Sequence, residues 1–270
     1  MKQPSQPASV DRLPYAWRVV AASIRGSAHE RAKMPCQDAH HWEALPDGTL
    51  VAAVADGAGT AALAEVGADV ASRTAIETMR IRRAAQPLPT DDGSWKTLLA
   101  DVLRTAKKAV EEEAEARGVM ERELATTLIL VVATDQLVAA VQVGDGGVVI
   151  TDDEDHIISI TAPTRGEYIN ETTFLASSDS LDTAMIKVWW GIAKAVCVFS
   201  DGLQMLALKM PEATPHDMFF SPLFQFVSKA SDDAWAQERL TAFLRSGRVT
   251  ERTDDDLTLL LAAHVDPEHS

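Results

Sequence analysis

Short apolar runs separated by polar, glycine-bearing turns predict the strands of this chain. Apolar runs of roughly four to eight residues, rich in Val, Ile and Ala and ended by polar residues, are typical of buried strands. Such runs predict strands at 17–26 and 49–56, three or four strands within 126–160, a hairpin over 184–201 that turns near Gly191, and a closing strand at 257–264. Tight acidic turns separate the strands within 126–160, which is typical of consecutive antiparallel pairs and not of βαβ units.

Longer alanine-rich or amphipathic segments predict helices on both sides of these strands. One helix is expected from Thr60 to about Arg82, because this stretch contains strong helix formers. A second helix is expected to have Ser94 as its N-cap and to end before Gly118. Further helices are expected around 202–209, 217–229 and 233–246. This order of elements favours an α+β fold in which helices cover antiparallel sheets.

The chain is expected to form a single domain over residues 15–265, preceded by a flexible N-terminal tail. Residues 1–14 are polar and contain three prolines, which is typical of such a tail. Residues 161–183 are polar and irregular, and they interrupt the run of strands. A domain of this length can bury a sizeable core.

The composition narrows the class of protein. The net charge of −15, from 40 acidic and 25 basic residues, argues against a nucleic-acid partner. Two cysteines do not make a disulfide framework, which suits a reducing compartment. We find neither a basic and apolar leader nor an apolar stretch of roughly 20 residues, so we expect a cytoplasmic protein without a membrane anchor.

Five acidic residues stand where predicted strands begin or end. They are Asp38, Asp56, Asp145, Asp201 and Asp255. Carboxylates gathered at the open end of a core repel one another, and hard divalent cations relieve that repulsion. An isolated Asp-Gly pair is first of all a turn, but these residues adjoin strongly apolar strands. The pattern therefore predicts a carboxylate-only metal centre, of the kind that generates hydroxide for hydrolysis.

A dinucleotide site is the alternative reading of the segment after Asp56. Residues 57–62 match a loose dinucleotide fingerprint between a strand and a helix. The charge of Asp56 would oppose a bound pyrophosphate, however, and the following segments do not alternate between strand and helix. The metal centre is the better interpretation.

Six motifs in this order resemble the metal-dependent type 2C protein serine/threonine phosphatase family, and most closely its compact bacterial branch. The motifs are GSAHERAKMPCQDAH, VADGAGT, the ATT of ELATTLIL, VGDGG, FSDG and DDLT. The resemblance covers roughly residues 17–264, and residues 166–178 are similar to the flap segment of bacterial members. Each motif alone is weak, but the six together are specific.

The resemblance implies a four-layer α-β-β-α sandwich with two central antiparallel sheets. It implies two divalent cations, manganese or magnesium, and attack of a metal-bridging water on phosphoserine or phosphothreonine. The implied partners are a phosphorylated protein substrate and a cognate serine/threonine kinase. A phosphatase-like regulatory protein without turnover, or a hydrolase of another phosphomonoester, are the alternatives.

The resemblance also implies roles for the acidic residues. Asp56 would bridge both cations, and the Gly57 carbonyl would bind the first of them. Asp201 and Asp255 would bind the second cation, while Asp38 would hold metal-bound waters. These four aspartates are the predicted catalytic residues. Asp145, in the GDGG that stands for a GDSR-like motif, would help to bind a weaker third cation.

The sequence departs from the family pattern at several positions. Gln37 stands where many members have Glu, and Ala58 stands where eukaryotic members have a histidine acid. Lys33 has the spacing from Asp38 of the family's phosphate-binding arginine, whereas Arg31 has its chemistry two residues away. We favour Lys33, because a contact of about 3 Å does not tolerate such a displacement unless the loop compensates. For His29, three roles are open: a metal ligand, a phosphate contact or a loop-ordering hydrogen bond.

Overall fold

The computed structural model describes residues 16–163 and 173–265. The predicted tail, residues 1–14, lies outside these ranges, and so do residues 164–172, which include the first part of the flap-like segment 166–178. No helix in the described ranges is both long enough and apolar enough to cross a membrane.

Two antiparallel sheets form the centre of the described structure. One sheet has the strand order β1 (Ala16–Ile24), β12 (Leu257–Val265), β9 (Ala193–Phe199), β6 (Gly147–Asp152), β7 (Ile157–Thr161). The other has the order β2 (Asp38–Ala44), β3 (Leu50–Asp56), β4 (Leu128–Ala133), β5 (Leu137–Val143), β8 (Met185–Trp190). Every pair of neighbouring strands in these two sheets is antiparallel. Because β3 lies between antiparallel neighbours and not in a βαβ unit, the dinucleotide interpretation is wrong.

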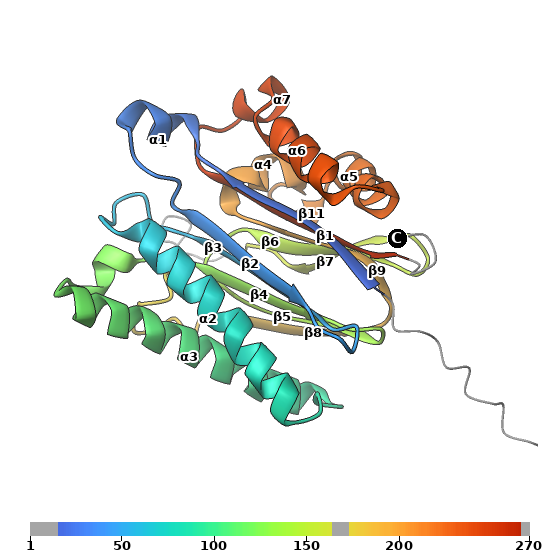
Figure 1. Ribbon diagram of the computed structural model, residues 1–270, viewed down its shortest axis with the longest axis horizontal. Coiled ribbons are helices and arrows are strands. Elements are labelled where there is room, and N and C mark those ends of the chain that lie inside the picture. The colour runs from blue at the N-terminus through green and yellow to red at the C-terminus, as the bar shows by residue number, and fades with distance from the viewer. Residues whose placement is uncertain (1–15, 164–172, 266–270) are drawn as a thin grey trace, which may run out of the picture.

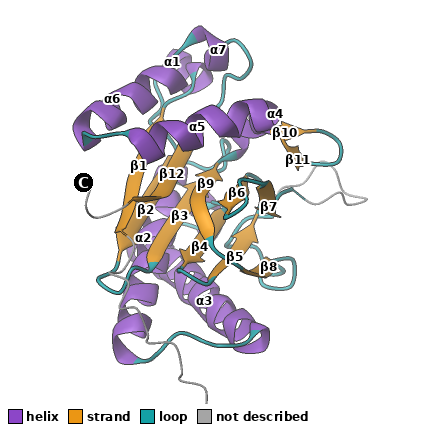
Figure 2. Ribbon diagram, turned by 90° about the vertical axis from the view of Figure 1, so that its right-hand side faces the viewer, coloured by secondary structure: helices purple, strands orange, loops and turns teal. Residues whose placement is uncertain are grey.

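A helical layer covers the outer face of each sheet (Figures 1 and 2). Helices α2 (Ala64–Ala85) and α3 (Asp92–Arg117) pack on the second sheet. Helices α5 (Asp217–Lys229) and α6 (Asp233–Leu244) pack on the first sheet. The predicted four-layer α-β-β-α sandwich is therefore confirmed.

Shorter elements complete the described part of the chain. They are α1 (Ser27–Ala32), η1 (Glu121–Leu124), η2 (Asp201–Leu203), α4 (Gln204–Ala207), the two-stranded ribbon of β10 (Leu208–Lys209) and β11 (Thr214–Pro215), and α7 (Gly247–Thr250). Helix α1 projects at one end of the sheets, at the upper left in Figure 1. That end also carries the acidic residues discussed below.

Alternation along the strands fixes which side chains lie between the sheets. In β3, the even-numbered residues 50, 52 and 54 face the other sheet, and the odd-numbered residues 51, 53 and 55 face the helices. In β9 and β12 the even-numbered residues again lie between the sheets, and the odd-numbered ones pack against α5 and α6. Both faces of these strands are buried, which explains their nearly continuous apolar sequences.

The predicted hairpin over 184–201 is wrong. Strand β8 pairs with β5 in one sheet, whereas β9 pairs with β6 and β12 in the other. The chain thus crosses between the sheets at Gly191 instead of turning back on itself. An apolar period shows that a strand is buried, but it does not show which strand lies beside it, and β9 is buried by neighbours on both of its edges.

The N-cap of α3 also differs from the prediction. Asp91 is the N-cap, and its side chain accepts a hydrogen bond from the backbone N–H of Ser94 at 2.9 Å. Aspartate at this position both caps the helix and interacts favourably with its dipole. Gly118 ends the helix as predicted, with a left-handed φ of 69°.

Candidate metal centre

The ends of four strands bring the predicted acidic residues to one end of the sandwich. Asp38 begins β2, Asp56 ends β3, and the two residues are direct partners in the antiparallel ladder. Asp201 follows β9, and Asp255 precedes β12. These two strands are neighbours in the sheet that does not contain β2 and β3. Both sheets therefore contribute carboxylates to the same place.

Hydrogen bonds join the two sheets at this end. The Ser200 hydroxyl donates to Asp38 Oδ2 at 2.7 Å and accepts from the Thr258 backbone N–H at 2.9 Å. The side chains of Asp56 and Asp201 lie close enough together that each changes the pKa of the other. Two carboxyl groups can form a hydrogen bond only when one of them is protonated, so a bond between this pair would require a proton when no cation is bound.

Burial and mutual repulsion raise the pKa of these carboxyl groups. Burial, together with the charges of Asp256 and Asp201, raises the pKa of Asp38 to about 7. Burial also raises the pKa of Asp56 well above its usual value of 3.8, and the charges of Asp38 and Asp201 add to the effect. The pKa values of Asp201 and Asp255 are raised by burial as well. The folded chain thus holds these carboxylates in a place that disfavours their charge.

Asp145 belongs to the same electrostatic neighbourhood. Its charge contributes to the raised pKa of Asp201. The residues on either side of it, Gly144 and Gly146, have left-handed φ values of 90° and 100°. A Cβ atom at Gly146 would lie 2.4 Å from the Phe199 carbonyl oxygen, so only glycine lets this turn pack against the end of β9.

The site residues fit divalent cations in their chemistry. Asp38 Oδ1 and Asp201 Oδ1 are buried and have no hydrogen-bond partner in the described part of the chain. Unpartnered buried carboxylate oxygens are unfavourable alone but are good ligands for hard cations. Among the described residues, no three acidic, histidine or cysteine side chains already converge at coordination distances. Three features therefore support a divalent-cation site: acidic residues gathered at the strand ends, carboxylate oxygens of Asp38 and Asp201 without hydrogen-bond partners, and raised carboxyl pKa values.

Two threonines hold the backbone of Asp56. The Thr127 hydroxyl accepts from the Asp56 N–H at 2.9 Å, and the Thr126 hydroxyl donates to the Asp56 carbonyl at 3.0 Å. The sequence motif contained both residues, but pattern reasoning gave them no role. At the next position, a Cβ atom on Gly57 would lie 2.7 Å from the Ala64 side chain, so glycine is needed where α2 packs.

The two candidate phosphate-binding residues lie on or next to α1. Arg31 is exposed and pairs with Asp254 at 3.2 Å, beside the acidic residues that precede β12. Lys33 caps the C-terminus of α1 with a left-handed φ of 57°, and its side chain is exposed. The structure brings both residues to the same end of the sandwich as the aspartates, and the preference for Lys33 stays a prediction.

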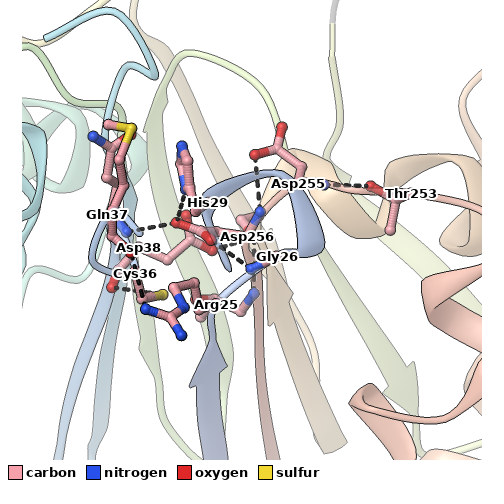
Figure 3. A network of polar contacts seen from close by, with 12 residues as sticks. Arg25, Gly26, His29, Cys36, Gln37, Asp38, Thr253, Asp255 and Asp256 are labelled. Atoms are coloured by element: carbon pink, nitrogen blue, oxygen red, sulfur yellow. Dashed lines mark hydrogen bonds and ion pairs between the residues drawn. The ribbon is translucent and has the colours of Figure 1, made fainter. Parts of the chain in front are cut away.

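Asp256 is the residue that pattern reasoning missed. Its buried carboxylate accepts hydrogen bonds from the Gly26 N–H at 2.6 Å, the Gln37 N–H at 2.5 Å and His29 Nδ1 at 2.9 Å (Figure 3). Three roles were open for His29, and its contact with Asp256 corresponds to the loop-ordering hydrogen bond. The alternation of β12 carries the missing signal, because Asp256 shares its parity with the inward-facing Thr258 and Leu260.

Comparisons with known proteins identify the family of the chain. The sequence model of the family Protein phosphatase 2C matches residues 25–245. Serine/threonine-protein phosphatase 3 of Escherichia coli (strain K12) is 35% identical over 254 residues, which are 92% of this chain and 98% of that protein.

Two solved structures have the same fold at low sequence identity. The phosphatase Stp1 from Staphylococcus aureus has a TM-score of 0.60 and 14% identity, covering 97% of this chain and 99% of its own. PppA of Pseudomonas aeruginosa has a TM-score of 0.59 and 19% identity, covering 92% of this chain and 97% of its own. From the family match and the similarity to the Escherichia coli protein, the chain belongs to the protein phosphatase 2C family.

Proposed function

We propose that the acidic centre is the active site of a phosphoprotein phosphatase that uses two divalent cations, manganese or magnesium. As a member of its family, the chain is a protein serine/threonine phosphatase. One observation supports this placement of the active site above all: buried aspartates from both sheets meet at one end of the sandwich. The proposed substrate is a phosphoserine or phosphothreonine protein, supplied by a serine/threonine kinase in the cytoplasm.

Each aspartate has a proposed role that follows from its neighbours. Asp56 contacts Asp201 and lies opposite Asp38, so it is the residue best placed to be shared between two cations. Asp201 and Asp255 would complete the second cation site, and Gly57 would contribute its carbonyl to the first. When bound, the cations would lower the pKa of a coordinated water and neutralise charge on the phosphoryl oxygens.

Two further aspartates would act at the edge of this centre. Asp38 would hold coordinated waters, because the Ser200 hydroxyl engages one of its oxygens and leaves the other free. Asp145 would contribute to a weaker third cation site through its position in the turn that packs on β9. These roles remain proposals that the variants below address.

The chain has no histidine acid in the turn between β3 and α2. Ala58 stands there and packs against Ala61, Ala64 and Ala125 in a small apolar cluster. No side chain at this position therefore protonates the leaving seryl or threonyl oxygen. Turnover should for this reason depend on the pKa of the leaving group, and p-nitrophenyl phosphate should react faster than a phosphoserine peptide at equal saturation.

Metal dependence of phosphopeptide hydrolysis tests the proposed function. Purified protein should release phosphate from phosphoserine and phosphothreonine peptides with Mn²⁺ or Mg²⁺, and EDTA should abolish the release. Readdition of Mn²⁺ to the chelated protein should restore it, which excludes denaturation as the cause. Undiminished turnover of the metal-free protein would contradict the mechanism. Mn²⁺ binding without turnover on any phosphopeptide would favour the regulatory alternative.

Lys33→Ala is expected to raise KM for a phosphopeptide about tenfold, because the variant lacks the ammonium group that would bind the phosphate. Binding of Mn²⁺ should change little. Lys33→Arg should retain or improve kcat/KM, since guanidinium can bind phosphate in a bidentate manner. Steady-state kinetics on these variants and on Arg31→Ala form the measurement. A silent Lys33→Ala beside a severe Arg31→Ala would assign the phosphate contact to Arg31.

A further inference from the structure

One buried carboxylate ties both ends of a twelve-residue segment to the start of β12. Asp256 is only 2% exposed. Its Oδ1 accepts from Gly26 N–H, where the segment 26–37 begins, and its Oδ2 accepts from Gln37 N–H, where it ends. Oδ2 also accepts from His29 Nδ1, within the segment. Figure 3 shows these three groups converging on the Asp256 carboxylate from different directions.

Backbone packing at the same junction leaves little room for movement. The Ala28 N–H donates to the Asp254 carbonyl at 2.9 Å. A Cβ atom at Gly26 would lie 2.2 Å from the Asp255 backbone, and one at Gly202 would lie 2.2 Å from the Asp256 carbonyl oxygen. Glycine at positions 26 and 202 therefore lets two neighbouring loops dock directly on the residues that precede β12. One of these loops begins with Asp201.

The chemistry of the contacts explains why an aspartate is needed at position 256. An ionised carboxylate can only accept hydrogen bonds, so His29 must donate from Nδ1, which fixes the orientation of its ring. Three N–H donors converge on two oxygens, and bonds of this kind to a charged acceptor are stronger than neutral ones. An asparagine of the same shape would turn an NH₂ group toward at least one of these donors. It would thus lose contacts without leaving a cavity.

We propose that Asp256 is a positioning residue for phosphate binding, an inference that rests on the proposed function. The segment that it holds carries both candidate phosphate-binding residues, Arg31 and Lys33, and it leads directly into Asp38. Asp256 itself adjoins Asp255 in the chain. By fixing both ends of the segment, the carboxylate sets the distance between the phosphate-binding side chain, Lys33 or Arg31, and the acidic centre. Misplacement of a binding group by about 1 Å can lower activity about a hundredfold.

Asp256→Asn tests this proposal, with Glu251→Gln as the matched control. Glu251 is an exposed acid five residues earlier, so its variant removes the same charge without touching the segment. We expect Asp256→Asn to lower kcat/KM for a phosphopeptide by about ten- to a hundredfold, mainly through KM. The Kd for Mn²⁺ should stay within about threefold of the wild type, since the proposed cation ligands are intact. The control should behave as the wild type does.

Amide hydrogen exchange supplies a readout that activity alone cannot give. In Asp256→Asn, exchange should accelerate within residues 26–37, while the amides of β3, β4 and β9 should keep their protection. His29→Gln removes one of the three contacts, so it should loosen the same segment less. Its effect on KM and that of Asp256→Asn should be less than additive in the double variant, because both act through one contact.

Several results would overturn the proposal. Normal KM in Asp256→Asn, with or without loosening of residues 26–37, would show that the carboxylate does not position the phosphate site. Loss of protection throughout the domain would show a general structural role instead. Should Asp256→Asn not fold, His29→Gln decides the question by the same measurements. If the wild type itself hydrolyses no phosphopeptide, the proposed function fails separately, and calorimetric binding of inorganic phosphate to the Mn²⁺-loaded protein replaces KM as the test of positioning.

Discussion

Asp56→Asn and Asp201→Asn are each expected to lower kcat for phosphopeptide hydrolysis by about a thousandfold or more, equivalent to at least ~4 kcal/mol of transition-state stabilisation. The two side chains are close neighbours in the acidic cluster, and each changes the pKa of the other. An amide keeps the size of the carboxylate but removes its charge, so each variant should bind cations more weakly. Steady-state kinetics over a range of Mn²⁺ concentrations would measure both effects.

The matched control for these variants is Asp153→Asn. Asp153 lies in the exposed acidic turn between β6 and β7, at the end of β6 opposite to Asp145, and its replacement removes the same charge away from the acidic centre. Its kcat should equal that of the wild type. Circular dichroism should show all three variants folded. Near-normal turnover of Asp56→Asn and Asp201→Asn at saturating Mn²⁺ would mean that catalysis occurs elsewhere.

The sequence predicted the layers of this fold because a buried strand is visible locally as a run of apolar residues. Strands β3, β4 and β9 are buried on both faces, and their nearly continuous apolar runs show this directly. The ends of such runs mark where the core meets solvent, so Asp56 and Asp201 could be placed at strand ends. The order of the family motifs then predicted that these ends come together.

Strand partners could not be predicted in the same way. The crossing at Gly191 depends on β8 completing one sheet and β9 filling the centre of the other. Both choices are set by contacts between residues distant in sequence, and an apolar period contains no information about them. A hairpin was therefore the natural local prediction, although the chain changes sheets there.

Asp256 was missed for a related reason. Three consecutive aspartates precede β12, and composition alone does not distinguish a solvated acid from a buried one. Asp254 is exposed and pairs with Arg31, Asp255 approaches the other acidic residues, and Asp256 turns inward. The parity of the strand that follows separates Asp256 from Asp255, but Asp254 has the same parity as Asp256 and differs only in lying further from β12. The partners of Asp256, the N–H groups of Gly26 and Gln37, belong to a segment more than two hundred residues away.

Asp38→Asn is expected to stabilise the metal-free protein at pH 8, although it should impair activity. Burial raises the pKa of Asp38 from 3.8 to about 7, so above pH 7 the folded wild type carries a charge that its surroundings disfavour. Asparagine resembles the protonated acid and can still accept the hydrogen bond from Ser200. Since one pKa unit corresponds to about 1.4 kcal/mol, the gain in the free energy of unfolding should be about 2 to 4 kcal/mol.

The pH dependence of this gain has a definite sign. Between about pH 4 and pH 7 the folded wild type binds more protons at Asp38 than the unfolded chain does, so its stability rises as the pH falls. The advantage of Asp38→Asn should therefore shrink toward pH 4. Burial lowers the pKa values of His40 and His264 to about 4, and their titration opposes this trend in absolute stability. Both proteins contain these histidines, so the difference between the proteins reports Asp38 together with its effect on the pKa of Asp56.

Urea unfolding in EDTA at pH 5 and pH 8 measures the difference directly, and Mn²⁺ supplies the complementary condition. A cation favours the ionised carboxylate and binds the folded wild type more tightly, so the advantage of the variant should shrink or reverse when Mn²⁺ is added. If Asp38→Asn were less stable than the wild type in EDTA at pH 8, the ionised carboxylate of Asp38 would not destabilise the metal-free protein. The charge of Asp38 would then be satisfied by the protein alone, and the strongest physical reason for expecting a cation at this end of the sandwich would be lost.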